Sequence, residues 1–343
     1  MKRCCVAGLV FAFAVAGCSA GTVSGTGTAA SHRSGPPAVV TAAGARQVLA
    51  QFTSGLNQAQ RTGDTGVLAR YVAGSSYQIR ATAFRDPAIK RSPAESFDQP
   101  RFYIPFQTSY PAWFAVHAQD TYLVFAKASA SARWLEVFEP STGHATVPAI
   151  ATDRQGYAVT APVGQAGRLA LAPDALPAAQ TTYLNSLTPV GTGQPCPPGT
   201  SKVLAARLGC ALPTPKTVTF ASSGLADLHD RAVFNQHGKG ELTIVNHHAT
   251  TSDQVYALRT TDGGVLVFYD LTADMVLGTG FGVPFSIDYP DLITKGKNED
   301  ASFEVDYREQ FAVYEPQGTP ARPRVVGQFG GAVGASCGGG HCR

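Results

Sequence analysis

Charged residues and long apolar runs are both scarce in this chain of 343 residues. Charged side chains make up 15% of it, and the formal net charge is +3. The dense positive charge that nucleic-acid binding requires is therefore missing. The apolar run near the start, residues 6–15, is too short to span a bilayer as a helix. We expect neither a nucleic-acid partner nor a membrane-spanning segment there.

The signature motifs of catalysis are missing as well. The sequence has no Gly-x-Ser-x-Gly nucleophile elbow, no P-loop and no Gly-x-Gly-x-x-Gly after a predicted strand. Gly278, Gly280 and Gly282 lack the third spacing of the dinucleotide-binding motif, so they are expected in a loop. No cofactor is expected. Pairs such as Glu304 and Asp306 are interpreted as solvated strand faces.

The first residues instead have the three parts of a lipoprotein signal peptide. Lys2 and Arg3 precede the apolar run, and residues 15–18 read Val-Ala-Gly-Cys. We expect cleavage after residue 17 and acylation of Cys18, palmitate included, which would anchor the protein on the extracytoplasmic face of the cell membrane. The mature chain would then carry +1, because two basic residues leave with the leader. An ordinary signal peptide with a chance cysteine is the alternative.

A flexible tether should follow over residues 18–40. Residues 19–37 are mostly Ser, Gly, Thr and Ala and end in two prolines. Such a composition buries too little apolar surface to offset the entropy of folding. The segment would hold the folded part of the protein off the membrane.

Helical periodicity and then strand periodicity predict an α+β first lobe over residues 41–172. Thr41 can cap a helix whose stripe recurs at Val48, Phe52, Leu56 and Ala59. Short helical turns are expected around 68–71 and 77–84. Four aromatic and β-branched runs then predict an antiparallel sheet, at residues 102–104, 113–116, 122–125 and 134–138.

The chain also resembles itself. Residues 113–118 and 123–125 recur as 255–260 and 266–268, at offsets of 142 and 143 residues, and 137–140 recurs as 313–316 at an offset of 176. A second helix is predicted with Asp174 as its cap and Pro177 in its first turn. We interpret this as a tandem duplication with a second α+β lobe over 173–330, an insertion of about 33 residues after Phe268, and a glycine-rich tail over 331–343. Chance likeness between short aromatic strands is the alternative.

Several stretches carry a resemblance to a known group. The leader, the helix from Thr41, residues 102–105 (Phe-Tyr-Ile-Pro), residues 110–114 (Tyr-Pro-Ala-Trp-Phe) and the second lobe together resemble an uncharacterised family of actinobacterial lipoproteins. That family has no established activity, so the resemblance implies no catalytic residue. Each lobe is also similar to the nuclear-transport-factor-2-like or cystatin-like class, in which a curved antiparallel sheet wraps a helix into a cone.

The cysteines fit an exported protein. Once the leader is removed and Cys18 is acylated, four remain: Cys196, Cys210, Cys337 and Cys342. An even number outside the cytosol favours disulfides. We expect Cys196 to pair with Cys210 and Cys337 with Cys342, because each pair is close in sequence. A soft metal ion bound by the last pair with His341 is the alternative.

A histidine cluster offers a metal site as a further alternative. His229, His237, His247 and His248 lie within twenty residues, near Asp227 and Asp230. However, His247 and His248 follow a predicted strand and should point to opposite faces, so they could not share one ion. Surface or loop histidines are the preferred interpretation, and no metal is expected.

Aromatic residues next to prolines are the remaining candidates for binding. Tyr103, Tyr110, Trp113 and Phe114 could line the open mouth of the first lobe, although core packing would explain them equally well. Without a catalytic motif, we expect a non-catalytic envelope protein that binds a partner protein, lipid or cell-wall component. An extracytoplasmic hydrolase with its site inside one lobe is the alternative.

Overall fold

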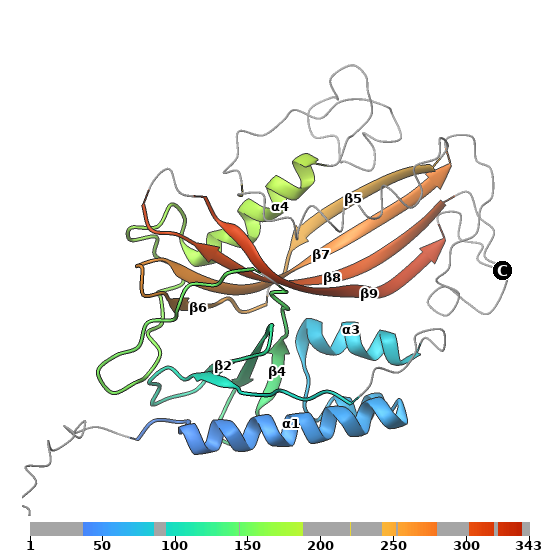
Figure 1. Ribbon diagram of the computed structural model, residues 1–343. Helices are drawn as coiled ribbons and strands as arrows, with labels where there is room; N and C mark the ends of the chain where they lie inside the picture. The colour runs from blue at the N-terminus through green and yellow to red at the C-terminus, as the bar shows by residue number, and fades with distance from the viewer. Residues whose placement is uncertain are drawn as a thin grey trace, which may run out of the picture. The chain divides into compact units, whose positions relative to one another are not determined.

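A computed structural model describes residues 37–85, 94–143, 145–187, 220, 242–251, 253–279, 302–318 and 322–337 (Figure 1). The helices are α1 (Ala42–Thr62), α2 (Thr65–Leu68), α3 (Gly74–Arg85) and α4 (Leu176–Leu187), with a 3-10 turn at Pro173–Ala175. The strands are β1 (Arg101–Tyr103), β2 (Ala112–Ala118), β3 (Thr121–Lys127), β4 (Leu135–Phe138), β5 (Leu242–Thr250), β6 (Tyr256–Arg259), β7 (Val265–Thr279), β8 (Ser302–Glu315) and β9 (Arg324–Cys337). These elements confirm the α+β class. None of the helices in these ranges is long and apolar enough to cross a bilayer.

Helix α1 begins and ends where its sequence predicts. The Thr41 hydroxyl accepts a hydrogen bond from the Gly44 N–H at 3.1 Å, which satisfies one of the free donors of the first turn. Gly63 ends the helix in the left-handed conformation, with φ of 67°. The buried stripe of α1 includes Phe52 and Leu56, so the predicted helix is confirmed.

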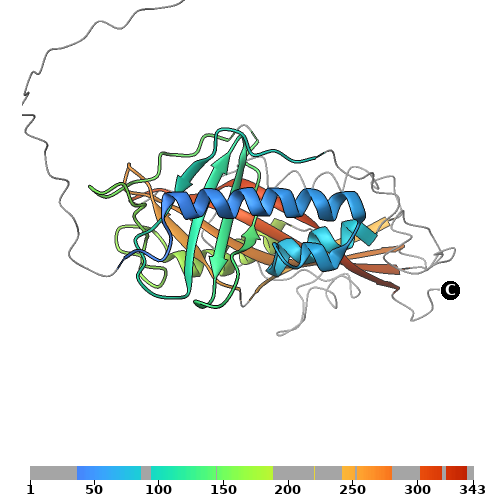
Figure 2. The same ribbon diagram turned by 90° about the horizontal axis from the view of Figure 1, so that it is seen from below.

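The first sheet is antiparallel in the order β1-β2-β3-β4 and lies under α1. Figure 2 shows α1 crossing its strands. Phe114 and Phe125 stack with ring centroids 5.1 Å apart, and Phe52 of α1 meets Phe125 edge-on at 5.3 Å. Trp113 and Val124 point to the other face, because successive side chains of a strand alternate between faces.

The second sheet has five antiparallel strands in the order β5-β7-β8-β9, with β6 paired to one part of β7. Its outer face packs against α4, where Leu176 and Leu184 join Phe311 in one core. Its inner face packs on the first sheet. Trp113 lies 5.0 Å from Tyr256, and Tyr122 lies 5.4 Å from Phe268, between ring centroids. The layers therefore run α1, first sheet, second sheet, α4, and the two lobes share a core.

Corresponding strands of the two lobes have matching registers. Ala115 pairs with Val124 on the β2–β3 hairpin, and Ala257 pairs with Val267 on the β6–β7 hairpin. These pairs are separated by the sequence offsets of 142 and 143 residues noted above. Likewise, Phe125 of β3 pairs with Glu136 of β4, as Phe268 of β7 pairs with Ala312 of β8. Residues 123–125 and 266–268 thus lie on equivalent strands, and the added residues of the second lobe lengthen β7 and β8.

Two local predictions are wrong. Residues 331–337 form the last part of β9 rather than a glycine-rich tail. The glycines suit a strand here because a helix approaches it closely: a Cβ on Gly331 would lie 2.9 Å from Cγ2 of Ile79 in α3. In the second lobe, Asp174 lies inside the 3-10 turn and does not cap it, since Ala172 precedes that turn without a side-chain hydrogen bond.

Candidate functional site

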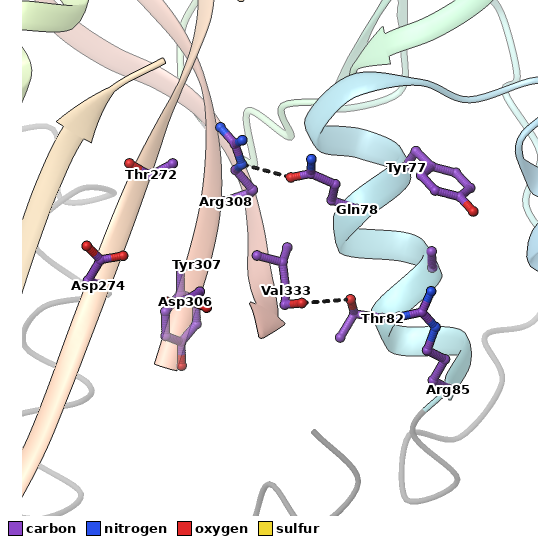
Figure 3. A pocket seen from close by; sticks show the side chains of 11 residues that line it. Tyr77, Gln78, Thr82, Arg85, Thr272, Asp274, Asp306, Tyr307, Arg308 and Val333 are labelled. Atoms are coloured by element: carbon purple, nitrogen blue, oxygen red, sulfur yellow. Dashed lines mark hydrogen bonds between the residues drawn. The ribbon is translucent and has the colours of Figure 1, made fainter. Parts of the chain in front are cut away.

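A pocket forms where the second sheet extends beyond the shared core. A cavity of about 430 Å³ lies between α3 and strands β7, β8 and β9 (Figure 3). We call it the α3 pocket. Its lining is rich in hydrogen-bonding groups and consists of Tyr77, Gln78, Ala81, Thr82, Arg85, Thr272, Asp274, Asp306, Tyr307, Arg308 and Val333.

Two hydrogen bonds set the distance between α3 and the sheet. Arg308 Nε donates to Gln78 Oε1 at 2.8 Å, and the Thr82 hydroxyl donates to the Val333 carbonyl at 3.5 Å. Figure 3 shows both bonds bridging from the helix to the strands. Gly334 leaves room for a carboxylate, because a Cβ there would lie 2.7 Å from Oδ2 of Asp306. The pocket is therefore bounded by contacts specific to these residues.

Two aspartates face each other across the sheet at this pocket. Asp274 of β7 and Asp306 of β8 are directly paired in the ladder, and like charges directly opposite each other destabilise a sheet. Partial burial, and next the charge of Asp274, raise the pKa of Asp306. Neither carboxylate forms a salt bridge with a residue in the described ranges. The protein thus keeps an electrostatically unfavourable pair that a ligand could neutralise.

The neighbouring histidines lie on opposite faces, as their alternation predicts. His247 of β5 is paired with Asp274, so the row His247, Asp274, Asp306 crosses three adjacent strands. His248 is buried, and its Nε2 lies 3.3 Å from Glu309 Oε2 on the side of α4. No cluster of three metal-ligating side chains occurs in the parts of the chain described. His229 and His237, with Asp227 and Asp230, lie outside those parts.

A buried carboxylate next to the pocket is also perturbed. The Thr251 hydroxyl donates to Asp270 Oδ1 at 2.6 Å, and Arg308 Nη1 lies 3.6 Å from Asp270 Oδ2. Burial is the main cause that raises the pKa of Asp270 to about 6. Because Arg308 contacts both Asp270 and Gln78, it connects the pocket to the interior of the sheet.

A buried polar network holds the start of α3. Arg80 Nε donates to Glu139 Oε2 at 2.9 Å, and Arg80 Nη1 donates to Glu95 Oε1 at 3.1 Å. Gln310 of β8 donates to the hydroxyls of Ser75 and Ser76 at 2.8 and 2.9 Å, and its Oε1 accepts from the Glu139 N–H at 2.8 Å. The network ties α3, the end of β4 and the second sheet together.

One arginine faces more carboxylates than it can neutralise. Glu136 is fully buried and accepts a hydrogen bond from the Ser76 hydroxyl at 2.8 Å. Burial, and next the charge of Glu139, raise its pKa well above the ordinary value. Burial also raises the pKa of Glu139, against the opposing effect of Arg80. We infer that Glu136 is neutral and that this network serves to position α3.

The four predicted aromatic residues do not line one mouth. Trp113 packs in the core between the sheets, whereas Phe114 packs under α1. Tyr103 stacks on Tyr122 with ring centroids 6.3 Å apart, and Lys127 Nζ lies 5.5 Å from the ring centroid of Tyr110. Strand alternation separates the neighbours Trp113 and Phe114, so core packing explains both.

The predicted lipidation and disulfide sites lie largely outside the described residues. Cys18, Cys196, Cys210 and Cys342 are not among them. The backbone of Cys337 pairs with Phe303 at the end of β9. The anchor and both disulfides therefore stay predictions.

The residues of the α3 pocket were not predicted as a site. Their one trace in the sequence is the alternation of polar residues along two otherwise apolar strands, at 270, 272 and 274 and at 306, 308 and 310. Alternation of this kind normally marks a solvated face. Helix α3 covers that face, and nothing in the local sequence signals this.

Fold and pocket together define an α+β protein of two face-to-face antiparallel sheets with a polar pocket at one end of the second sheet. The chain belongs to the family described as Domain of unknown function (DUF8094), which matches residues 36–207 and 212–337.

A relative from Streptomyces avermitilis described as an "Uncharacterized lipoprotein" is 26% identical over 238 residues. The match covers 66% of this chain and 63% of the relative, so the chain spans less than two thirds of that protein's length. These findings confirm the resemblance to an uncharacterised family of actinobacterial lipoproteins. No solved structure matches the chain, and the likeness to the nuclear-transport-factor-2-like or cystatin-like class stays a prediction.

Proposed function

We propose that this protein is a lipid-anchored lipoprotein on the extracytoplasmic face of the cell membrane that binds a cell-wall component in the α3 pocket. The anchor is supported by the Val-Ala-Gly-Cys motif at residues 15–18 and by the description of the Streptomyces relative as a lipoprotein. A tether between anchor and folded part raises the local concentration of the pocket near other envelope components.

The anchor is tested by changing Cys18. Cys18→Ala removes the thiol that would be acylated, so we expect the protein to leave the membrane fraction and to lose incorporated fatty acid. Fractionation and labelling with a palmitate analogue measure this. A matched control, Ser19→Ala, should stay in the membrane fraction. Equal membrane retention of both variants without label would contradict the anchor.

The single observation that carries the binding function is the facing pair Asp274 and Asp306 in an open pocket. Two carboxylates without a basic partner in the described ranges favour a ligand that brings positive charge or hydroxyl donors. Tyr77, Gln78 and Thr272 add further hydrogen-bonding groups to the wall. A glycan bearing amines and hydroxyls meets both requirements, and such glycans are components of bacterial cell walls.

The ligand class is tested with a matched pair of glycans. Chitosan oligosaccharides carry free amines, and the corresponding chitin oligosaccharides carry acetylated ones on the same skeleton. We expect tighter binding of the amine form, weakened about tenfold or more, or about 1.4 kcal/mol, by Asp274→Asn or Asp306→Asn. Asp98→Asn changes an exposed aspartate outside the pocket and should leave binding unchanged. Titration calorimetry measures all four proteins, and equal affinities would contradict the proposal.

A hydrolase is the second candidate, because of one specific feature of the same residues. Asp306 has a raised pKa, and Asp274 is flanked by His247. A carboxyl group that keeps its proton beside an ionised one is the arrangement used for general acid catalysis. Turnover of a cell-wall glycan that Asp306→Asn abolishes while binding persists would replace the binding function by this one.

We also propose that the two lobes, residues 41–172 and 173–330, arose by tandem duplication. The equivalent registers of β2–β3 and β6–β7 support it, as do the strand-end motifs Glu139-Pro140 and Glu315-Pro316. Both glutamates are buried and anchor the segment next to a helix. Glu139 accepts from Arg80 of α3, and Glu315 accepts from the Leu171 N–H before α4 at 2.7 Å.

A further inference from the structure

A second cavity, of about 590 Å³, lies in the first lobe between the middle of α1 and the segment that leads into β4. We call it the α1 cavity. Three basic side chains line it, Arg70, Lys127 and Arg133, and none of its lining residues is acidic. It therefore differs in charge from the α3 pocket, whose wall carries two aspartates.

The three basic groups have no counter-charge. None of them forms a salt bridge with a residue in the ranges that the structure describes. Arg70 and Arg133 are exposed and Lys127 is half-buried, where its Nζ lies 5.5 Å from the Tyr110 ring centroid. Cations gathered around one hollow repel each other, and a bound anion would relieve that repulsion.

The rest of the wall is aromatic and firmly held. Trp134 meets Phe114 edge-on with ring centroids 5.1 Å apart, so one side of the indole is packed while the residue also lines the cavity. The Tyr71 carbonyl accepts from the Glu136 N–H at 2.8 Å. A ligand here would meet positive charge on one side and rigid apolar rings on the other.

Gly55 of α1 is part of this arrangement. A Cβ on Gly55 would lie 2.1 Å from the Tyr71 ring, so a larger residue could not occupy the position without displacing the tyrosine. Glycine inside a helix costs about 0.5–1 kcal/mol relative to alanine. Its presence in the middle of α1 is therefore explained by the close approach of the Tyr71 ring to the helix.

We infer that the α1 cavity binds a phosphate group attached to an apolar substituent. Arginine pairs form bidentate hydrogen bonds to phosphate, and a lysine adds a third positive charge. The aromatic wall suits the apolar part, and Trp and Tyr side chains are typical of membrane interfaces. Two sources share this chemistry: the headgroup of an anionic phospholipid and a soluble phosphate ester. The inference does not depend on the ligand of the α3 pocket.

The experiment uses the full chain carrying Cys18→Ala, so that no lipid anchor holds the protein on vesicles. Trp113→Phe is added to leave Trp134 as the single tryptophan, since the chain has two, and its fluorescence then reports on the α1 cavity. The probes are phosphatidylglycerol–phosphatidylcholine vesicles, pure phosphatidylcholine vesicles and soluble glycerol 3-phosphate.

Arg70→Gln with Arg133→Gln removes two exposed charges from the α1 cavity. The matched control, Arg154→Gln with Arg168→Gln, removes two exposed charges elsewhere. We expect phosphate-dependent binding that shifts Trp134 emission and is weakened about tenfold or more in the cavity variant, but not in the control.

The outcomes separate the sources. Binding to the phosphatidylglycerol vesicles and not to the neutral ones assigns a lipid headgroup. A Trp134 shift with glycerol 3-phosphate alone, equally sensitive to the cavity variant, assigns a soluble phosphate ester. Equal loss in both double variants would mean nonspecific surface charge and would overturn the inference, as would the absence of binding to every probe.

Discussion

Replacing Arg80 by methionine is expected to lower the free energy of unfolding by about 3–5 kcal/mol, because removing one partner of a buried ion pair leaves the other charge unpaired. The carboxylates of Glu139 and Glu95 would lose the guanidinium that both contact. Helix α3 would then lose its connection to the end of β4, and the α3 pocket would lose its fixed wall.

The loss should depend on pH. Without Arg80, the already raised pKa of Glu139 would rise further, so its folded-state pKa would lie above the unfolded value. A carboxyl group of that kind destabilises the fold at neutral pH and ceases to do so as it takes up a proton. Denaturant unfolding of Arg80→Met should therefore show a smaller deficit at acidic pH than at neutral pH.

A matched control is available on the same helix. Arg85 is exposed, so Arg85→Met should change the free energy of unfolding by about 0.5 kcal/mol or less. An Arg80→Met protein as stable as Arg85→Met at neutral pH would show that the network does not hold α3.

Replacing Phe268 by alanine is expected to cost about 3–5 kcal/mol, as truncations of a fully buried phenylalanine do. Phe268 is completely buried in the core between the sheets, where its ring meets Tyr122 of the first sheet. Because that core belongs to both lobes, we expect a substitution in the second lobe to destabilise the first.

The two tryptophans make this measurable. Trp113 and Trp134 both lie in the first lobe, so their fluorescence follows that lobe alone, while far-UV circular dichroism follows the whole chain. In Phe268→Ala both signals should move together to lower denaturant concentration. Phe268→Leu keeps most of the volume and should cost about 1.5 kcal/mol or less. A fluorescence transition that stays in place while the dichroism transition moves would show that the lobes unfold independently.

Local patterns predicted most of the secondary structure. The cap and stripe of α1, the four strands of the first sheet and the β6–β7 hairpin all depend on residues close in sequence. Periodicities of about four and of two residues record which side of an element is buried. The same patterns misled at β9, because glycine suits a tail as well as a strand over which a helix packs.

The pockets could not be predicted in this way. The α3 pocket brings Arg85 of α3 together with Asp274 of β7 and Asp306 of β8, which are far apart in the chain. Arg80 and Glu139 are equally ordinary in sequence, and their proximity depends on where α3 packs. Trp113 and Phe114 show the converse: they are neighbours in sequence, but the pleat of β2 places them in different cores.

By itself, the sequence determined the α+β class, the strand registers repeated between the lobes and the expectation of a lipid anchor at Cys18, since each is written in residues near one another. The tertiary structure alone decided that the sheets share a core and that α3 covers the polar end of the second sheet. The physical reason is that packing between elements depends on the shapes and charges of surfaces assembled from distant segments, as where Gly331 admits Ile79 and Arg308 meets Gln78.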